Sequence, residues 1–139
     1  MNNQTRYILS ELLNKRILLL DGAIGTQVQN LKLSEDDYRG ERFNHHASQH
    51  QGNTDLLSLT QPDTIREIHE AYLKAGSDII STNTFSASAI SQSDYGTEDL
   101  SYNINFSSAK IASQAAQMIY SEEPDKPRFV AGAVGPTTR

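Results

Sequence analysis

The stretch "LTQPDTIREIHEAYLKAGSDIISTNTF", residues 59–85, holds a helix signal and a strand signal in immediate succession, and it decides the fold class. Its first part is apolar at helical spacing, which predicts a helix whose inward face consists of Ile65, Ile68, Tyr72 and Ala75. Its last part, residues 78–85, begins with isoleucines and ends in Thr and Asn, which predicts a strand with a polar tip. A helix that runs straight into a buried strand is typical of α/β proteins.

Both ends of this helix are marked by the sequence. Thr60 followed by Asp63 resembles a capping box in which Asp replaces Glu, and Pro62 suits the first turn of a helix. Gly76 stands where a left-handed residue would end the helix. We therefore expect the helix to begin near Pro62 and to end at Gly76.

Similar signals lie on either side of this stretch. Upstream, residues 7–15 predict a helix and residues 17–20 predict a short strand. Downstream, residues 128–136 predict another strand, preceded by a helix over residues 100–120 whose inward face is Ile104, Ser108, Ile111, Ala115 and Met118 or Ile119. Residues 34–53 are polar and irregular, which is typical of a functional or disordered connection.

Strands that alternate with helices pair in parallel, with right-handed crossovers. The ends of the three predicted strands should then share one rim, which carries Asp21, the Asn83-Thr84-Phe85 tip and the Gly135-Pro136 turn. Three strands cannot close a barrel, and a (β/α)8 TIM barrel needs roughly 250 residues. We therefore expect an α/β fold in which residues 1–139 form the N-terminal part of a larger domain.

Composition excludes several classes of function. The net charge is −5 and the 12 Lys and Arg residues are scattered, so a nucleic-acid-binding face is not expected. The sequence contains no cysteine, which excludes disulfides and thiolate metal ligands within these residues. The longest aliphatic run, residues 17–20, is too short for a membrane span or a signal peptide. We expect a soluble cytoplasmic protein.

The segment "ILLLDGAIGT", residues 17–26, places an acid and a glycine at a strand tip. The segment lacks the GxGxxG and P-loop patterns, and Ala23 stands where an aspartyl phosphatase needs a second Asp. An ionised Asp21 would suit an ammonium group, and the amides of Gly22 and Ala23 could approach a carboxylate. Together they would suit an amino acid, although the residues alone somewhat favour the interpretation that Asp21 only caps the turn.

Other polar residues permit two interpretations each. Asn83 and Thr84 could orient a substrate or could bond neighbouring loops. His45, His46 and His50 could suggest a metal site, but a solvated loop is the favoured interpretation.

His69 is on the inward helix face. We expect a packed histidine there, bonded to backbone or to a side chain, rather than a catalytic one.

Three segments, "DGAIGT", "GNTDLLSLTQPDTIREIHEAYLKAGSDIISTNTF" and "VAGAVGPTTR", resemble the homocysteine S-methyltransferase barrel family. The resemblance covers the chain from Ile17 onward, in order and at sensible spacing. "DYRGERF" and "GNTDLLSLTQP" look more like the cobalamin-dependent methionine synthase branch than the betaine or S-methylmethionine branches.

The resemblance implies that the larger domain is a (β/α)8 TIM barrel, of which residues 1–139 hold about the first three strands with their helices. It implies that this barrel binds homocysteine and zinc at its C-terminal rim and makes methionine with a methyl group from methylcobalamin. It also implies cobalamin-binding and folate-binding modules elsewhere in the full-length chain. The family's zinc is held by three Cys from later strands, which this sequence lacks, so this portion alone should be inactive.

The resemblance also assigns substrate-binding positions to three motifs, which here are Asp21, Gly22 and Ala23, then Asn83, Thr84 and Phe85, then Gly135 and Pro136. Asp21 matches the acid that contacts the substrate amino group, and the amides after it lie near the substrate carboxylate. Ser81 and Thr138 depart from the family pattern, where Glu and Asn are more usual. The alternatives are a homocysteine methyltransferase with another donor, or a non-catalytic α/β module that binds an amino acid or a protein.

Overall fold

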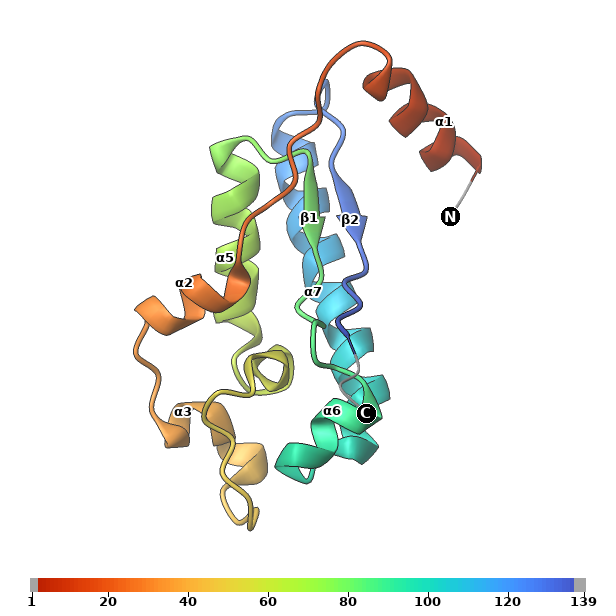
Figure 1. Cartoon of the computed structure of the whole chain (residues 1–139). Coiled ribbons are helices and arrows are strands. Elements are labelled where there is room, and N and C mark those ends of the chain that lie inside the picture. Colours follow the sequence, from red (N-terminus) through yellow and green to blue (C-terminus); the bar gives the residue numbers. More distant parts are fainter. Residues whose placement is uncertain (1–2, 137–139) are drawn as a thin grey trace.

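The computed structural model describes residues 3–136 of the 139-residue chain and has a mixed α/β architecture (Figure 1). Helices and short 3-10 helices alternate with a small parallel sheet. Thr138 lies outside the described residues. The elements in order are α1 (Asn3–Leu13), α2 (Ile24–Asn30), α3 (Glu35–Arg39), η1 (Glu41–Phe43), η2 (Thr54–Leu56), α4 (Leu57–Thr60), α5 (Pro62–Ala75), β1 (Ile79–Ser81), α6 (Ala89–Gln92), η3 (Ser93–Tyr95), η4 (Glu98–Leu100), α7 (Ser101–Glu122) and β2 (Phe129–Ala131).

The sheet has the predicted parallel direction, but its strands are shorter than expected. Strands β1 and β2 pair in parallel, with Ile80 opposite Val130. The predicted first strand, residues 17–20, forms only one parallel bridge, between Leu20 and Ile79. It does not become a full strand because Ile17 is 84% exposed, and apolar residues left in water give the segment little to pack against.

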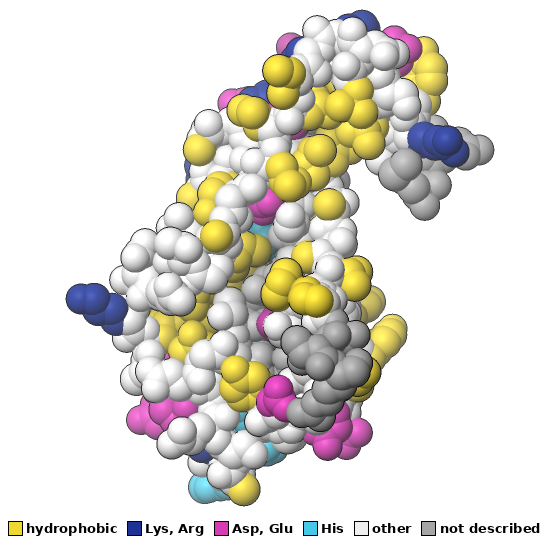
Figure 2. All heavy atoms as spheres, in the orientation of Figure 1, with side chains coloured by type: hydrophobic (Ala, Val, Ile, Leu, Met, Phe, Trp, Pro, Cys, Tyr) yellow, Lys and Arg dark blue, Asp and Glu magenta, His cyan; other side chains and the backbone are white. Residues whose placement is uncertain are grey.

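Helices α5 and α7 cover one face of the sheet (Figure 1). Small residues of α7 let this helix approach the strands closely. The two helices and β1 share a core cluster, with Val130 of β2 packed against it; its members are Leu73, Ile80, Ala112, Ala115, Ala116 and Ile119. The face of the molecule in Figure 2 carries exposed hydrophobic side chains. Leu19, Leu20 and Val134, which lie in segments outside the two strands, are exposed.

Most predicted features of the two long helices are confirmed. Pro62 opens α5, and Gly76 ends it in a left-handed conformation with φ of 118°. The predicted capping box of α5 is wrong, because Thr60 belongs to α4 and the side chain of the N-cap residue, Gln61, makes no capping hydrogen bond to the helix. Ala75 is exposed, because α5 turns Leu73 toward the sheet instead.

In α7 the predicted inward face is confirmed, with Ile119 rather than Met118 completing it. The polar stretch 34–53 is ordered in part, since Ser34 caps α3 through a capping box with Asp37. Within residues 3–136, no helix combines the length and apolar character that a membrane crossing requires.

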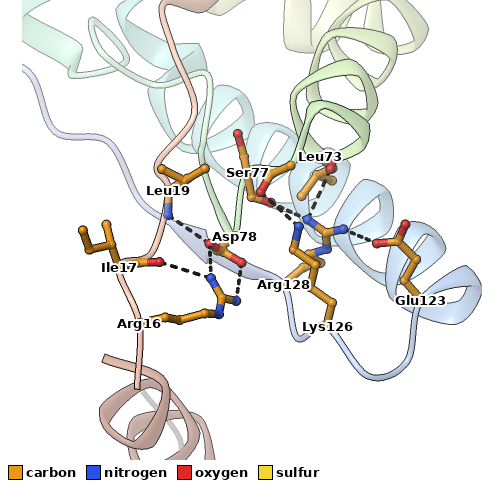
Figure 3. Close-up of polar contacts among 10 residues, drawn as sticks. Arg16, Ile17, Leu19, Leu73, Ser77, Asp78, Glu123, Lys126 and Arg128 are labelled. Carbon is orange, nitrogen blue, oxygen red and sulfur yellow. Dashed lines mark hydrogen bonds and ion pairs between the residues drawn. The ribbon is translucent and has the colours of Figure 1, made fainter. Parts of the chain in front are cut away.

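At the end of the sheet opposite the predicted rim, polar contacts connect Arg16 and Leu19 with Asp78, which directly precedes β1 (Figure 3). The buried Asp78 carboxylate accepts two hydrogen bonds from Arg16, at 2.8 and 2.6 Å, and one from the backbone N–H of Leu19, at 2.9 Å. Arg128 donates to the carbonyls of Leu73 and Ser77 beside it. The bonds from Arg16 and Leu19 to Asp78 hold the segment before Asp21 beside β1.

Candidate functional site

A pocket of about 650 Å³ lies where the predicted strands end, and we call it the rim pocket. Its walls come from the turn into α2, the loop into η2, the end of β1, the α6–η3 segment and the chain after β2. The lining residues are Gly22, Ala23, Ile24, Gly25, Gly52, Asn53, Thr54, Asp55, Ser81, Thr82, Asn83, Thr84, Phe85, Ser86, Ser91, Asp94, Tyr95, Ala133 and Pro136. Residues from all three predicted rim motifs therefore lie around one pocket.

Asp21 lies beside this pocket, not in its lining. Its half-buried carboxylate accepts hydrogen bonds from the backbone N–H of Ser81, at 2.8 Å, and from the Ser81 hydroxyl, at 3.0 Å. Each oxygen therefore has one protein donor, and an ionised carboxylate has room for about four. Asp21 links the first segment to the end of β1 and retains acceptor capacity for a ligand.

Asn83 and Thr84 both bond neighbouring segments. The Asn83 amide donates to the carbonyl of Thr54, at 2.8 Å, and to the hydroxyl of Ser58, at 3.1 Å. The Thr84 hydroxyl donates to the carbonyl of Ala133, at 2.8 Å. Of the two interpretations that the sequence permits, these contacts support a role in building the pocket wall.

Gly135 and Phe85 bring two segments into close contact. A β-carbon at Gly135 would overlap the backbone carbonyl of Phe85, so only glycine fits there. The Phe85 ring is 65% exposed and lines the rim pocket beside Pro136. The turn after β2 therefore requires a glycine at residue 135.

Gly22, which also lines the rim pocket, is a second glycine in close contact with a neighbouring residue. A β-carbon there would lie 2.9 Å from the hydroxyl of Tyr72. That hydroxyl also donates to the carbonyl of Ala23, at 3.3 Å. The turn that follows Asp21 is thus held against α5 through Tyr72.

Gly22→Ala is expected to lower the free energy of unfolding by about 1 kcal/mol, because Tyr72 must move away from Ala23. Urea unfolding of the chain measures this. Gly25→Ala is the matched control, since a β-carbon there meets nothing within 4 Å and alanine favours the helix. Equal stability of the two variants would contradict the proposed contact.

Sequence reasoning missed Asp55, a buried acid in the pocket wall. Asp55 is 5% exposed, and burial raises the pKa of its carboxyl despite hydrogen bonds from backbone amides such as Ser86 N–H, at 3.2 Å. The signal was present in "GNTDLL", where an acid directly precedes a pair of leucines that are fully buried. The lining residues include Asp55 and Asp94, whereas none in this described set is Lys, Arg or His. The pocket wall is therefore acidic.

For the segment between β1 and α7, the sequence patterns predicted no secondary structure. It forms α6 and η3 and is anchored by Gln92, which is fully buried. The Gln92 side chain exchanges hydrogen bonds with Asn53, at 2.9 and 3.1 Å. This amide pair locks the α6–η3 wall onto the loop before η2.

The histidines of residues 45–50 only partly match the expected solvated loop. His45 is exposed, but His50 is fully buried, with its ring centroid 4.6 Å from that of His46. Burial, together with the charges of His46 and Arg39, lowers the pKa of His50, while Glu35 opposes this. Among residues 3–136, no group of three or more His, Cys, Asp or Glu side chains could hold a metal ion.

His69 is fully buried on α5, as expected. The predicted hydrogen bond is wrong: neither ring nitrogen has a partner within the part of the chain that the structure describes. Burial lowers the pKa of His69, and the charge of Asp21 raises it in part.

The chain is similar to known proteins in sequence and in structure. Residues 18–139 match the family model described as homocysteine S-methyltransferase. The oxidized form of the homocysteine methyltransferase MmuM from Escherichia coli is similar, with 28% identity, a TM-score of 0.71, and coverage of 92% of this chain and 40% of that one. The metallated form of the same protein is similar at 27% identity and a TM-score of 0.71, with coverage of 92% and 41%. The chain thus spans about two fifths of the length of these structures.

Proposed function

The chain belongs to the homocysteine S-methyltransferase family, and we propose that residues 1–139 form the N-terminal portion of a homocysteine-binding (β/α)8 barrel domain. The observation that carries this proposal is the rim pocket. It gathers motifs separated by more than a hundred residues, from Gly22 to Pro136, at the end of a parallel sheet. Ligands of barrel enzymes bind at this end of the strands.

We propose that Asp21 receives the ammonium group of homocysteine. Its carboxylate is already oriented by Ser81 and has acceptor capacity left. The exposed backbone at Gly22 and Ala23 would receive the substrate carboxylate. The ring of Phe85 offers an apolar surface for the methylene carbons between these groups and the thiol.

The zinc that the resemblance implies does not fit the residues of this chain. Its 139 residues include no cysteine, and residues 3–136 offer no cluster of metal ligands. A free thiol with a pKa of about 8.5 is a poor nucleophile at neutral pH. We therefore assign substrate binding to this portion, and activation of the thiol to residues outside it.

For the methyl donor we propose methylcobalamin, giving methionine as in the cobalamin-dependent methionine synthase branch. The support is the likeness of "DYRGERF" and "GNTDLLSLTQP" to that branch. The proposal implies cobalamin-binding and folate-binding modules as partners in the same full-length chain. Assay of the full-length enzyme with methylcobalamin, S-methylmethionine and betaine would separate the donors, and methionine formed only from one of the latter two would overturn this assignment.

In the full-length enzyme, Asp21→Asn is expected to raise the KM for homocysteine about tenfold, because a charge-assisted hydrogen bond to the substrate ammonium is lost. Steady-state kinetics with varied homocysteine measures this. Asp63→Asn is the matched control, since that side chain is 79% exposed on α5. An unchanged KM for Asp21→Asn would refute the assigned role.

A further inference from the structure

His69 is a buried polar side chain that the proposed function does not use. It is 0% exposed, and neither of its ring nitrogens has a hydrogen-bond partner within residues 3–136. Buried polar groups are nearly always hydrogen-bonded, so such a residue needs an explanation. A histidine that served only to fill space would be replaceable by leucine, without the cost of burying its polar nitrogens.

The position of His69 on α5 directs its side chain toward the turn at Gly22 and Ala23, which lines the rim pocket. It lies one turn before Tyr72, on the buried face of the helix. Tyr72 reaches the turn at Gly22 and Ala23, and side chains on a helix lean toward its N-terminus. Asp21 directly precedes this turn, and its charge acts on the His69 imidazole. The helical spacing between His69 and Tyr72 thus directs His69 toward the segment that contains Asp21, and the electrostatic effect of Asp21 on His69 agrees with this placement.

The chemistry of the two side chains is complementary. A neutral imidazole carries one N–H donor and one acceptor nitrogen. The Asp21 carboxylate has one donor on each oxygen, both from Ser81, and can accept more. An acid that binds an ammonium group must keep its lone pairs directed at the ligand, and a third donor, from a residue other than Ser81, would help to hold it there.

We propose that His69 is a positioning residue for Asp21: its neutral imidazole donates an N–H, through one water molecule, to the Asp21 carboxylate and holds it toward the substrate ammonium. The inference rests on the proposed function of Asp21 as the ammonium-binding acid. It adds a residue from α5 to a site otherwise built from the ends of strands and from loops.

A double-mutant cycle in the full-length enzyme tests the inference. His69→Leu removes the donor while keeping an apolar volume, and His69→Gln keeps an N–H donor. We expect His69→Leu to raise the KM for homocysteine about tenfold and His69→Gln to raise it less than threefold. In the Asp21→Asn background, His69→Leu should change the KM less than twofold. Equal effects of His69→Leu with and without Asp21→Asn would overturn the inference.

A spectroscopic measurement covers the case in which His69→Leu fails to fold. In the full-length protein labelled with ¹⁵N-histidine, the His69 signals are assigned by their loss in His69→Gln. Asp21→Asn should shift the imidazole nitrogen resonances of His69, and unchanged resonances would overturn the inference. This readout needs no activity. A wild-type enzyme that does not methylate homocysteine would overturn the proposed function, whereas an unshifted His69 in an active enzyme would overturn only this inference.

Discussion

Gly135→Ala is expected to lower the free energy of unfolding by about 3 kcal/mol, because its β-carbon would occupy the space of the Phe85 carbonyl oxygen. The obstacle is backbone, not the end of a flexible side chain, so the turn after β2 must move away from the tip of β1. Urea unfolding of the chain measures the loss. In the full-length enzyme the displaced pocket wall should also lower kcat/KM for homocysteine about a hundredfold.

Gly132→Ala is the matched control for this experiment. It lies in the same segment, and a β-carbon there meets no atom within 4 Å. The expected change in the free energy of unfolding of the chain is within about 0.5 kcal/mol. If Gly135→Ala were as stable as Gly132→Ala, that result would contradict the close contact between Gly135 and the Phe85 carbonyl.

Asp78→Ala is expected to lower the free energy of unfolding by about 2 kcal/mol. The carboxylate is buried and accepts bonds from Arg16 and from the Leu19 N–H, which loses its partner when the acid is removed. The effect stays below that of a fully buried pair, because the Arg16 side chain is 39% exposed. Asp63→Ala, which removes an exposed i,i+3 ion pair with Arg66, should cost less than about 0.5 kcal/mol.

The contribution of Asp78 should also depend on pH. The hydrogen bonds from Arg16, together with that from Leu19, hold the pKa of Asp78 below its usual 3.8, although burial opposes them. The unfolded chain therefore takes up the proton first as the pH falls, so this stabilisation is present above pH 3.8 and is lost as the pH drops through the folded-state pKa. The stability difference between wild type and Asp78→Ala should narrow below pH 3.8. A constant difference down to pH 2 would contradict the assigned hydrogen bonds.

Local sequence patterns predicted the two long helices and the parallel direction of the strands correctly. Pro62 and Gly76 bound α5, and the spacing from Ile104 to Ile119 marks the inward face of α7, as the structure confirms. These features depend on residues a few positions apart, which is why periodicity and turn chemistry detect them. The gathering of Gly22, Asn83 and Pro136 at one pocket followed from the parallel order alone.

Features that depend on distant partners were not predictable in this way. The segment 17–20 has the composition of a strand, yet it makes a single bridge, because strand formation needs neighbours that pack on its side chains. The polar stretch 34–53 looked irregular, but Glu35 accepts bonds from the backbone N–H groups of His50 and Gln51 and orders it. An acid that satisfies amides fifteen residues away leaves no periodic signal.

The sequence by itself determined the alternation of helices and strands, their parallel direction, and the three motifs at one rim, because each arises from short-range patterns and a general rule of chain crossover. Only the tertiary structure decided how those motifs are used. It placed Asp21 against Ser81, buried Asp55 in the pocket wall, and buried His69 with no hydrogen-bond partner among residues 3–136. Burial and hydrogen-bond partners come from the packing of segments far apart in the chain, and local patterns do not encode them.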